Sequence, residues 1–170
     1  MNLCFKCKKE VEASHKKHGL HKKCFKEWFS LIDEAEDFKD IYQPKETFDG
    51  SPEKKLYQTT FFHGKFKKYS AILGGKKYIL KICQDHPELA KTEYLCNQLA
   101  VTAGLDIPKN YLIRFMENED CFVTYNFMQD YQGGALQHIY HFIEHNQYNI
   151  EALLKVIEKK TNRLSELQKL

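Results

Sequence analysis

Four potential metal ligands lie in two closely spaced pairs near the start of the chain. Cys4 and Cys7 form a C-x2-C pair, and His21 and Cys24 form an H-x2-C pair after thirteen intervening residues. Two such pairs supply the four nitrogen and sulfur ligands of a closed tetrahedral zinc site. The intervening segment has few apolar side chains, so metal binding would contribute most of its folding free energy, on the order of 10 kcal/mol. We therefore predict one zinc ion at these four residues.

Two further features of residues 1–24 leave alternatives open. His15 and His18 compete with His21 as the histidine ligand. The segment also carries seven lysines against two acidic residues, which suits contact with phosphate and makes nucleic-acid binding one alternative. A solvated basic face is the simpler interpretation, so direct nucleic-acid binding is not our first expectation.

A lysine in an apolar strand and a glutamate in the following helix could form an ion pair. Residues 78–82 read as a β-strand with Lys81 among apolar residues, where an ammonium requires a partner. Glu93 lies in a helical pattern and shares a face with Cys96 and Ala100. We expect Lys81 and Glu93 to contact each other. The alternative is an ordinary strand and amphipathic helix, with Lys81 extended to water and Glu93 solvated.

The other periodic segments predict an α+β fold with an antiparallel sheet and one packed helix. In chain order we expect a helix over 23–38, a polar connector over 39–47, strands over 56–62, 66–73 and 78–82, a helix from Pro87 to Gly104, strands over 111–116 and 121–127, and helices over 136–145 and from Ile150 onward. Gly74 and Gly75 predict a hairpin turn. These elements suggest three parts: 1–38 as a zinc knuckle with a helix, 48–131 as the α+β domain, and 132–170 as a helical segment.

The composition is that of a globular protein. The 170 residues are 42% hydrophobic and 29% charged, with a net charge of +3 that does not by itself indicate a nucleic-acid partner. No apolar run approaches the ~20 residues needed to span a bilayer, and the first ten residues lack the apolar core of a secretory signal. We expect a cytoplasmic protein with no membrane partner, in which Cys83, Cys96 and Cys121 are buried free thiols.

Residues 76–104 resemble the HipA family of bacterial Ser/Thr kinase toxins in the succession YILK, PEL, EY and LA..AGL..P. The C-x2-C and H-x2-C pairs, followed by the aromatic residues Phe25, Trp28 and Phe29, are also similar to the start of several HipA-like proteins. The resemblance implies a structural zinc knuckle followed by a kinase N-lobe built as meander, helix and hairpin. It also implies that Lys81 and Glu93 hold the α/β-phosphates of ATP, with Mg²⁺ as a further cofactor.

The same resemblance implies two further contacts with the nucleotide. A Ser-Gly-x-x-x-Lys loop covers the phosphates in the family, and here Gly50 and Lys54 match, Asp49 replaces the first Ser, and Ser51 follows the glycine. We take Gly50, Ser51 and Lys54 as candidate nucleotide-binding residues. The backbone of residues 125–128 would meet the adenine edge, although only an aromatic residue of the family pattern is kept there.

The catalytic and metal-binding residues of the family are missing from this sequence. HipA-like kinases carry a stretch resembling N-x-D-R-H-x-x-N and a later metal-binding Asp, and the only Asn-Arg pair here, at 162–163, has no Asp beside it. No catalytic residue is therefore assigned. We expect the chain to be the amino-terminal part of a HipA-like kinase and to have no kinase activity by itself. Its partner would be a DNA-binding antitoxin or a separate C-lobe chain, and the substrate of the intact enzyme would be a protein. The alternative is a non-catalytic zinc-knuckle module that docks on or regulates a kinase.

Overall fold

The computed structural model describes residues 3–43, 66–116, 119–131, 142–143 and 149–160. The chain divides into two compact units, and all described residues up to 131 belong to the first. The second unit contains α4 (Ile150–Lys160), which begins where Asn149 Oδ1 accepts a 2.8 Å hydrogen bond from the Ala152 N–H. The helix expected from Ile150 is therefore confirmed as far as Lys160.

The first unit is built on a five-stranded antiparallel sheet with the order β3-β4-β5-β7-β6. Its strands are β3 (Lys39–Tyr42), β4 (Lys67–Leu73), β5 (Lys76–Ile82), β6 (Asn110–Phe115) and β7 (Glu119–Tyr125). Gly74 and Gly75 join β4 to β5 with φ angles of 56° and 72°, which suit the two-residue turn predicted there. With the helices described below, this sheet confirms the predicted α+β class.

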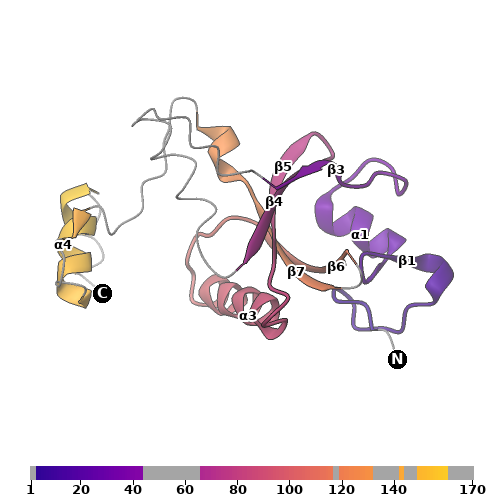
Figure 1. Ribbon diagram of the computed structural model, residues 1–170, viewed down its shortest axis with the longest axis horizontal. Coiled ribbons are helices and arrows are strands. Elements are labelled where there is room, and N and C mark those ends of the chain that lie inside the picture. Colours follow the sequence, from indigo (N-terminus) through magenta and orange to yellow (C-terminus); the bar gives the residue numbers. More distant parts are fainter. Residues whose placement is uncertain (1–2, 44–65, 117–118, 132–141, 144–148, 161–170) are drawn as a thin grey trace. The chain divides into compact units, whose positions relative to one another are not determined.

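The two faces of the sheet are covered by different elements (Figure 1). Alternation along β5 places Tyr78, Leu80 and Ile82 on one face and Lys81 on the other. The first face packs against α1 (Lys22–Phe29) and the residues before it, in one core with Ile113 and other β6 and β7 residues. The second face packs against α3 (Glu88–Thr102) through a smaller core of Ala90, Leu112 and Phe122.

Helix α1 is shorter than the sequence predicts, and the helix expected to continue to residue 38 is wrong beyond Phe29. Ser30 adopts a left-handed conformation with φ 55°, and its N–H still donates to the Glu27 carbonyl at 3.3 Å. The Glu36 carboxylate then accepts the N–H groups of Ile32 and Asp33, each at 2.9 Å. These bonds replace the next helical turn.

Strand β3 lies where a polar connector was expected, so that expectation is also wrong for residues 39–42. The strand pairs antiparallel with β4 through Lys39↔Ile72 and Tyr42↔Ser70. All four of its side chains are exposed, and an exposed edge strand has no apolar alternation to reveal it. The turn and strand expected within residues 44–65, and most of the helix expected over 136–145, lie outside the described residues.

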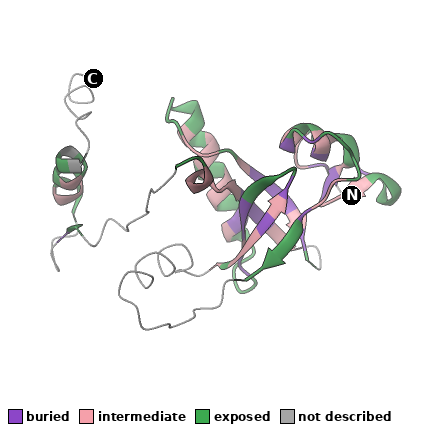
Figure 2. Ribbon diagram, turned by 90° about the horizontal axis from the view of Figure 1, so that it is seen from above, coloured by how far each residue is buried: buried purple, intermediate pink, exposed green. Residues whose placement is uncertain are grey.

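Helix α3 has the expected bounds but turns a different side to the sheet. Pro87 precedes it, and Gly104, with φ 81°, follows its last turn. Leu95 and Leu99 are 60% and 69% exposed. Cys96, expected to be buried, is exposed as well, whereas Cys83 and Cys121 are buried as predicted. Most of α3 is exposed or only partly buried (Figure 2). The helix is apolar on more than one side, so its periodicity does not identify the packed side.

Within residues 3–43, 66–116, 119–131, 142–143 and 149–160, no helix combines the length and apolar character that a membrane span requires.

One half-buried polar contact joins the segment after α1 to the sheet. His18 Nε2 lies 2.7 Å from Asp37 Oδ1, and His18 Nδ1 lies 3.2 Å from the Arg114 carbonyl oxygen of β6. The imidazole ring sits among three phenylalanine rings, those of Phe25, Phe38 and Phe115. Burial opposes ionisation of Asp37, but the hydrogen bond from His18 outweighs it and holds the pKa of that carboxyl below its usual value.

We predict that Asp37→Asn lowers the free energy of unfolding by about 1 kcal/mol at neutral pH, because the carboxylate bonded to His18 is lost. The effect is small because half of the Asp37 side chain faces water. A depressed carboxyl pKa stabilises the fold above pH of about 4, and this contribution disappears as pH falls through the folded-state pKa. Chemical denaturation of the wild type and the variant should therefore converge in acid. Asp85→Asn, an exposed control, should match the wild type throughout, and equal stabilities of Asp37→Asn and the wild type at neutral pH would contradict the assignment.

Candidate functional site

The first pair of candidate ligands is positioned by a tight turn. The Cys4 N–H donates to the Lys9 carbonyl at 2.8 Å, and the Lys8 N–H donates back to the Cys4 carbonyl at 2.9 Å. Lys8 adopts a φ of 62°, which closes the turn and lets both cysteine side chains point to the same side. The turn thus brings the two thiols of the C-x2-C pair to the same side of the chain.

The second pair is positioned by a small hairpin and the start of α1. Strands β1 (Lys16–Lys17) and β2 (Leu20–His21) pair antiparallel, so His21 ends β2 and Cys24 lies in the first turn of α1. Gly19 has a φ of 77° in the hairpin turn. A Cβ atom at Gly19 would lie 3.0 Å from the Phe5 ring and 3.1 Å from Arg114 Cγ, so the position requires glycine on two grounds.

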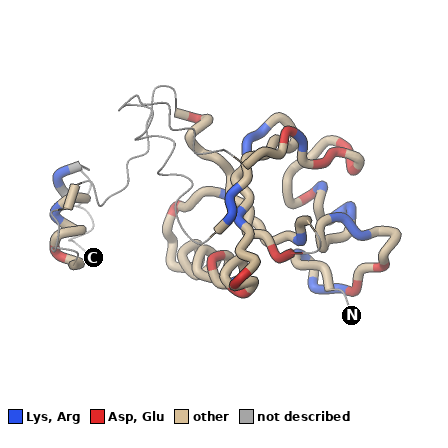
Figure 3. The backbone as a smooth tube through the Cα atoms, viewed as in Figure 1, with Lys and Arg blue, Asp and Glu red and all other residues tan. Residues whose placement is uncertain are grey.

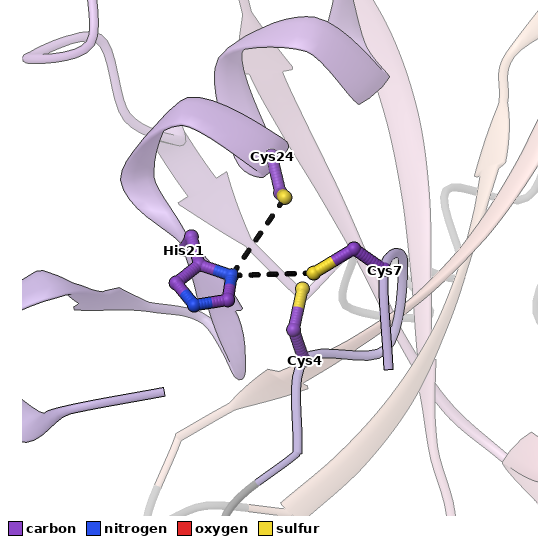
Figure 4. A group of neighbouring side chains, drawn as sticks. All are labelled: Cys4, Cys7, His21 and Cys24. Carbon is purple, nitrogen blue, oxygen red and sulfur yellow. Dashed lines mark hydrogen bonds between the residues drawn. The ribbon is translucent and has the colours of Figure 1, made fainter. Parts of the chain in front are cut away.

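The four predicted ligands come together, as Figure 4 shows. Their ligand atoms all lie within 4.8 Å of one another. The His21 Nδ1 atom is 3.5 Å from Cys7 Sγ and 3.8 Å from Cys24 Sγ. Sulfur atoms bound to one tetrahedral zinc ion at about 2.3 Å would be about 3.8 Å apart, so the cluster has the size that a metal ion requires. The cluster could bind a metal ion.

The tautomer of His21 is set by a backbone contact. Its Nε2 atom lies 2.9 Å from the Glu10 carbonyl oxygen, so Nε2 carries the proton and donates it. The lone pair of Nδ1 then faces the three sulfur atoms, as a metal-binding imidazole requires. A backbone carbonyl leaves no mark in the residue types, so this partner could not be predicted from the sequence.

The pKa values of Cys4 and Cys24 are shifted in opposite directions. Burial opposes ionisation of Cys4, but the N–H groups of Cys7, His21 and Lys6 outweigh it and lower the pKa of Cys4 to about 6. Burial, followed by the neighbouring Cys7 and Cys4 sulfurs, raises the pKa of Cys24 to about 12. The sulfurs cannot all ionise side by side without a cation among them, which is the chemistry expected of a metal-binding donor set.

The competing histidines do not join the cluster. Both ring nitrogens of His18 face acceptors elsewhere, namely Asp37 and the Arg114 carbonyl. His15 is exposed, and its Nδ1 atom lies 3.2 Å from Ser14 Oγ and 3.6 Å from Glu12 Oε2. The structure therefore supports His21 as the histidine of the set.

The cysteine cluster is joined to the sheet. Phe29 of α1 stacks on Tyr111 of β6 with ring centroids 4.2 Å apart, and the Arg114 N–H donates to the His18 carbonyl at 2.8 Å. Cys4, Leu20 and Phe25 are fully buried in the core that they share with the strands. Loss of the ligand cluster would uncover this face of the sheet.

On the opposite face, the predicted Lys81–Glu93 contact is confirmed. Lys81 Nζ lies 2.5 Å from Glu93 Oε1, and both side chains are only about a quarter exposed. The Lys81 ammonium also lies 5.1 Å from the centroid of the Phe122 ring. Strand alternation and the inward position of Glu93 on α3 bring the two charges together, as the spacing predicted.

A second lysine accompanies Lys81. Lys68 of β4 is the direct cross-strand partner of Lys81 in the antiparallel register, so both side chains leave the same face of the sheet. Burial, and then the charge of Lys81, lower the pKa of Lys68. This face therefore places two ammonium groups and one carboxylate within a small, half-buried area.

The structure describes only part of the other predicted nucleotide-binding residues. Gly50, Ser51 and Lys54 lie outside the described residues. In residues 125–128, β7 ends at Tyr125, and η2 (Phe127–Asp130) follows. The N–H groups of Tyr125 and Asn126 donate to Lys109 and Lys77 carbonyls at 2.8 and 3.0 Å. An adenine edge would have to compete with those bonds.

The basic residues of the first segment are partly neutralised, as the mixed charges in Figure 3 illustrate. Lys6 Nζ lies 2.5 Å from Glu27 Oε2. Lys17 Nζ donates to the Glu34 carbonyl at 2.9 Å and to the Glu36 carbonyl, with Asp37 3.8 Å away. Lys6 and Lys17 thus serve contacts within the fold.

Three comparisons with known proteins, with family models, with curated proteins and with solved structures, find no match to this chain.

We predict that Cys7→Ser loses most of the bound metal and lowers the unfolding temperature of the first unit. A three-ligand site binds metal more weakly, and the ligand cluster is part of the core that covers the sheet. Metal content by mass spectrometry and thermal unfolding would be measured together. Cys96→Ser, which removes an exposed thiol of α3, is the matched control and should keep the wild-type metal content. A full equivalent of metal in Cys7→Ser would contradict the assignment.

Proposed function

We propose that the chain is the amino-terminal part of a HipA-like, ATP-dependent protein Ser/Thr kinase. The observation that carries the proposal is the Lys81–Glu93 ion pair between β5 and α3. It occurs within a meander, helix and hairpin in the order that the kinase N-lobe uses. In kinases this pair positions the α/β-phosphates of ATP. The sequence resemblance to the HipA family, whose matching residues include Lys81 and Glu93, points to the same function.

We infer that the metal at the cysteine cluster is zinc. Three thiols and one imidazole form the Cys₃His donor set that is common in structural zinc sites. All four positions of a tetrahedron would be filled by protein, which leaves none for a substrate. The role that fits is structural: the ion would hold residues 4–24 against the sheet.

The face that carries Lys81 also suits a phosphate group. Lys68 and Lys81 project side by side from β4 and β5, and the Glu93 carboxylate contacts Lys81. A triphosphate approaching this face would meet charge-assisted donors in a half-buried environment, where such contacts are strong. If ATP binds with Mg²⁺, Lys81 would contact the phosphates and Glu93 would hold the lysine in place.

Phosphoryl transfer requires groups that this sequence lacks. No stretch resembling N-x-D-R-H-x-x-N is present, and no later Asp is available to hold Mg²⁺ in the family manner. We therefore expect nucleotide binding without turnover from this chain alone. A C-lobe chain or a DNA-binding antitoxin would be its partner, and a protein hydroxyl would be the substrate of the complete enzyme.

A second candidate function is a non-catalytic zinc-knuckle module that docks on a kinase. The observation that favours it is the outer side of α3, where Leu95 and Leu99 are exposed one helical turn apart. On that proposal the Lys81–Glu93 pair is structural and ATP does not bind. Nucleotide binding therefore separates the two proposals.

The test is calorimetric titration of the metal-loaded chain with Mg-ATP. We predict that Lys81→Ala weakens binding at least about tenfold, because a charge-assisted phosphate contact is lost. Glu93→Gln should weaken it less, since the ammonium remains but loses its fixed position. Lys39→Ala, which removes an exposed lysine from edge strand β3, is the matched control and should bind like the wild type.

Equal Mg-ATP affinity for the wild type and Lys81→Ala would exclude a nucleotide site at the ion pair. Absence of binding by the wild type would favour the docking module.

A further inference from the structure

A cavity of about 590 Å³ lies at the end of the sheet where β5 begins and β7 ends. It is lined by Tyr78, Tyr111 and Tyr125, which share the face covered by α1. Lys81 lies on the opposite face, so the cavity is separate from the nucleotide site proposed above. Its volume is within the range of sites that bind small organic molecules, about 300–1,000 Å³.

Phe29 and Tyr111 of the cavity wall stack on each other, but two other pairs of aromatic rings in the wall meet at steep angles. The Phe127 and Tyr131 rings meet at 87°, and the Tyr78 and Tyr125 rings meet at 75°. A flat heteroaromatic ligand prefers parallel walls between which it can stack. Rings that meet near right angles border a compact space, which suits a rounded group such as a substituted ammonium.

The electrostatics of the cavity also favour a cation. Aromatic faces are negative, and the carboxylates of Asp106 and Asp130 line the same cavity. The Tyr125 hydroxyl donates to Asp130 Oδ1 at 2.8 Å, which fixes that carboxylate beside the rings. Phe29 and Ser30, at the C-terminal end of α1, bring the negative end of the helix dipole to the wall.

We propose that this cavity binds an organic ammonium group, enclosed by Tyr125, Phe127 and Tyr131 and balanced by Asp130. Lys76 and Lys109 also line the cavity, and all four charged residues are exposed. Asp130 is held beside the rings by its bond from the Tyr125 hydroxyl, whereas the long lysine side chains can extend into water. A group the size of choline fills only part of the volume, so the natural ligand carries a further moiety. The ammonium belongs either to a small molecule or to a methylated lysine of a peptide.

The experiment is calorimetric titration of the full, metal-loaded chain with choline and with its neutral carbon isostere, 3,3-dimethyl-1-butanol. The two probes have nearly the same shape and differ in charge. Choline should bind at least about fivefold more tightly, because only a cation gains from the ring faces and the carboxylates. A peptide bearing trimethyllysine, titrated in parallel, identifies the source: tighter binding than choline assigns a peptide ligand, and weaker binding assigns a small molecule.

Single substitutions test whether choline binds in this cavity. Tyr131→Leu and Asp130→Asn should each weaken choline binding several-fold, and the Asn side chain can still accept the bond from Tyr125. Tyr42→Leu and Asp85→Asn remove an exposed tyrosine and an exposed aspartate elsewhere and should have no effect. Lys109→Gln should tighten binding, because it removes a like charge from the cavity.

Three results would overturn the proposal. They are equal affinity for choline and its neutral isostere, no choline binding at millimolar concentrations, and weaker choline binding in Lys109→Gln. The last result would show that the charge of Lys109 does not oppose a cation bound in this cavity.

Discussion

The convergence of four ligand atoms on one point is the constraint on which the first unit depends. Cys4, Cys7, His21 and Cys24 come from two turns that have few apolar residues of their own, yet their backbones are held in a metal-binding arrangement. Three sulfur atoms so close together repel one another once ionised, and a single cation removes that repulsion. Because Leu20 and Phe25 of the same segment are buried against the strands, metal binding and completion of the core are coupled.

The two faces of the sheet therefore have different chemistry. The face beneath α1 is apolar and aromatic, and the cavity where β5 begins is lined by several aromatic rings. The face beneath α3 carries the cross-strand lysines of β4 and β5 and the glutamate of the helix. Period-two alternation along the strands separates these environments, so a ligand on one face need not compete with a ligand on the other.

Interactions between residues close in the chain were predictable, and those set by tertiary contacts were not. The cysteine pairs and the Gly74-Gly75 turn are local patterns, and the Lys81–Glu93 pair follows from one strand and the next helix. The end of α1 depends on Ser30 and the Glu36 carboxylate, which no helical periodicity reveals. Exposed β3 has no alternation, and α3 is apolar on more than one side, so neither its packed face nor the exposure of Leu95 could be deduced.

X-ray absorption spectroscopy of the purified, metal-loaded chain tests the central claim most directly. The account predicts zinc in a four-coordinate shell of three sulfur atoms at about 2.3 Å and one nitrogen atom at about 2.0 Å. Those ligands correspond to Cys4, Cys7, Cys24 and His21. A shell made only of nitrogen and oxygen, or one with fewer than three sulfur atoms, would contradict it.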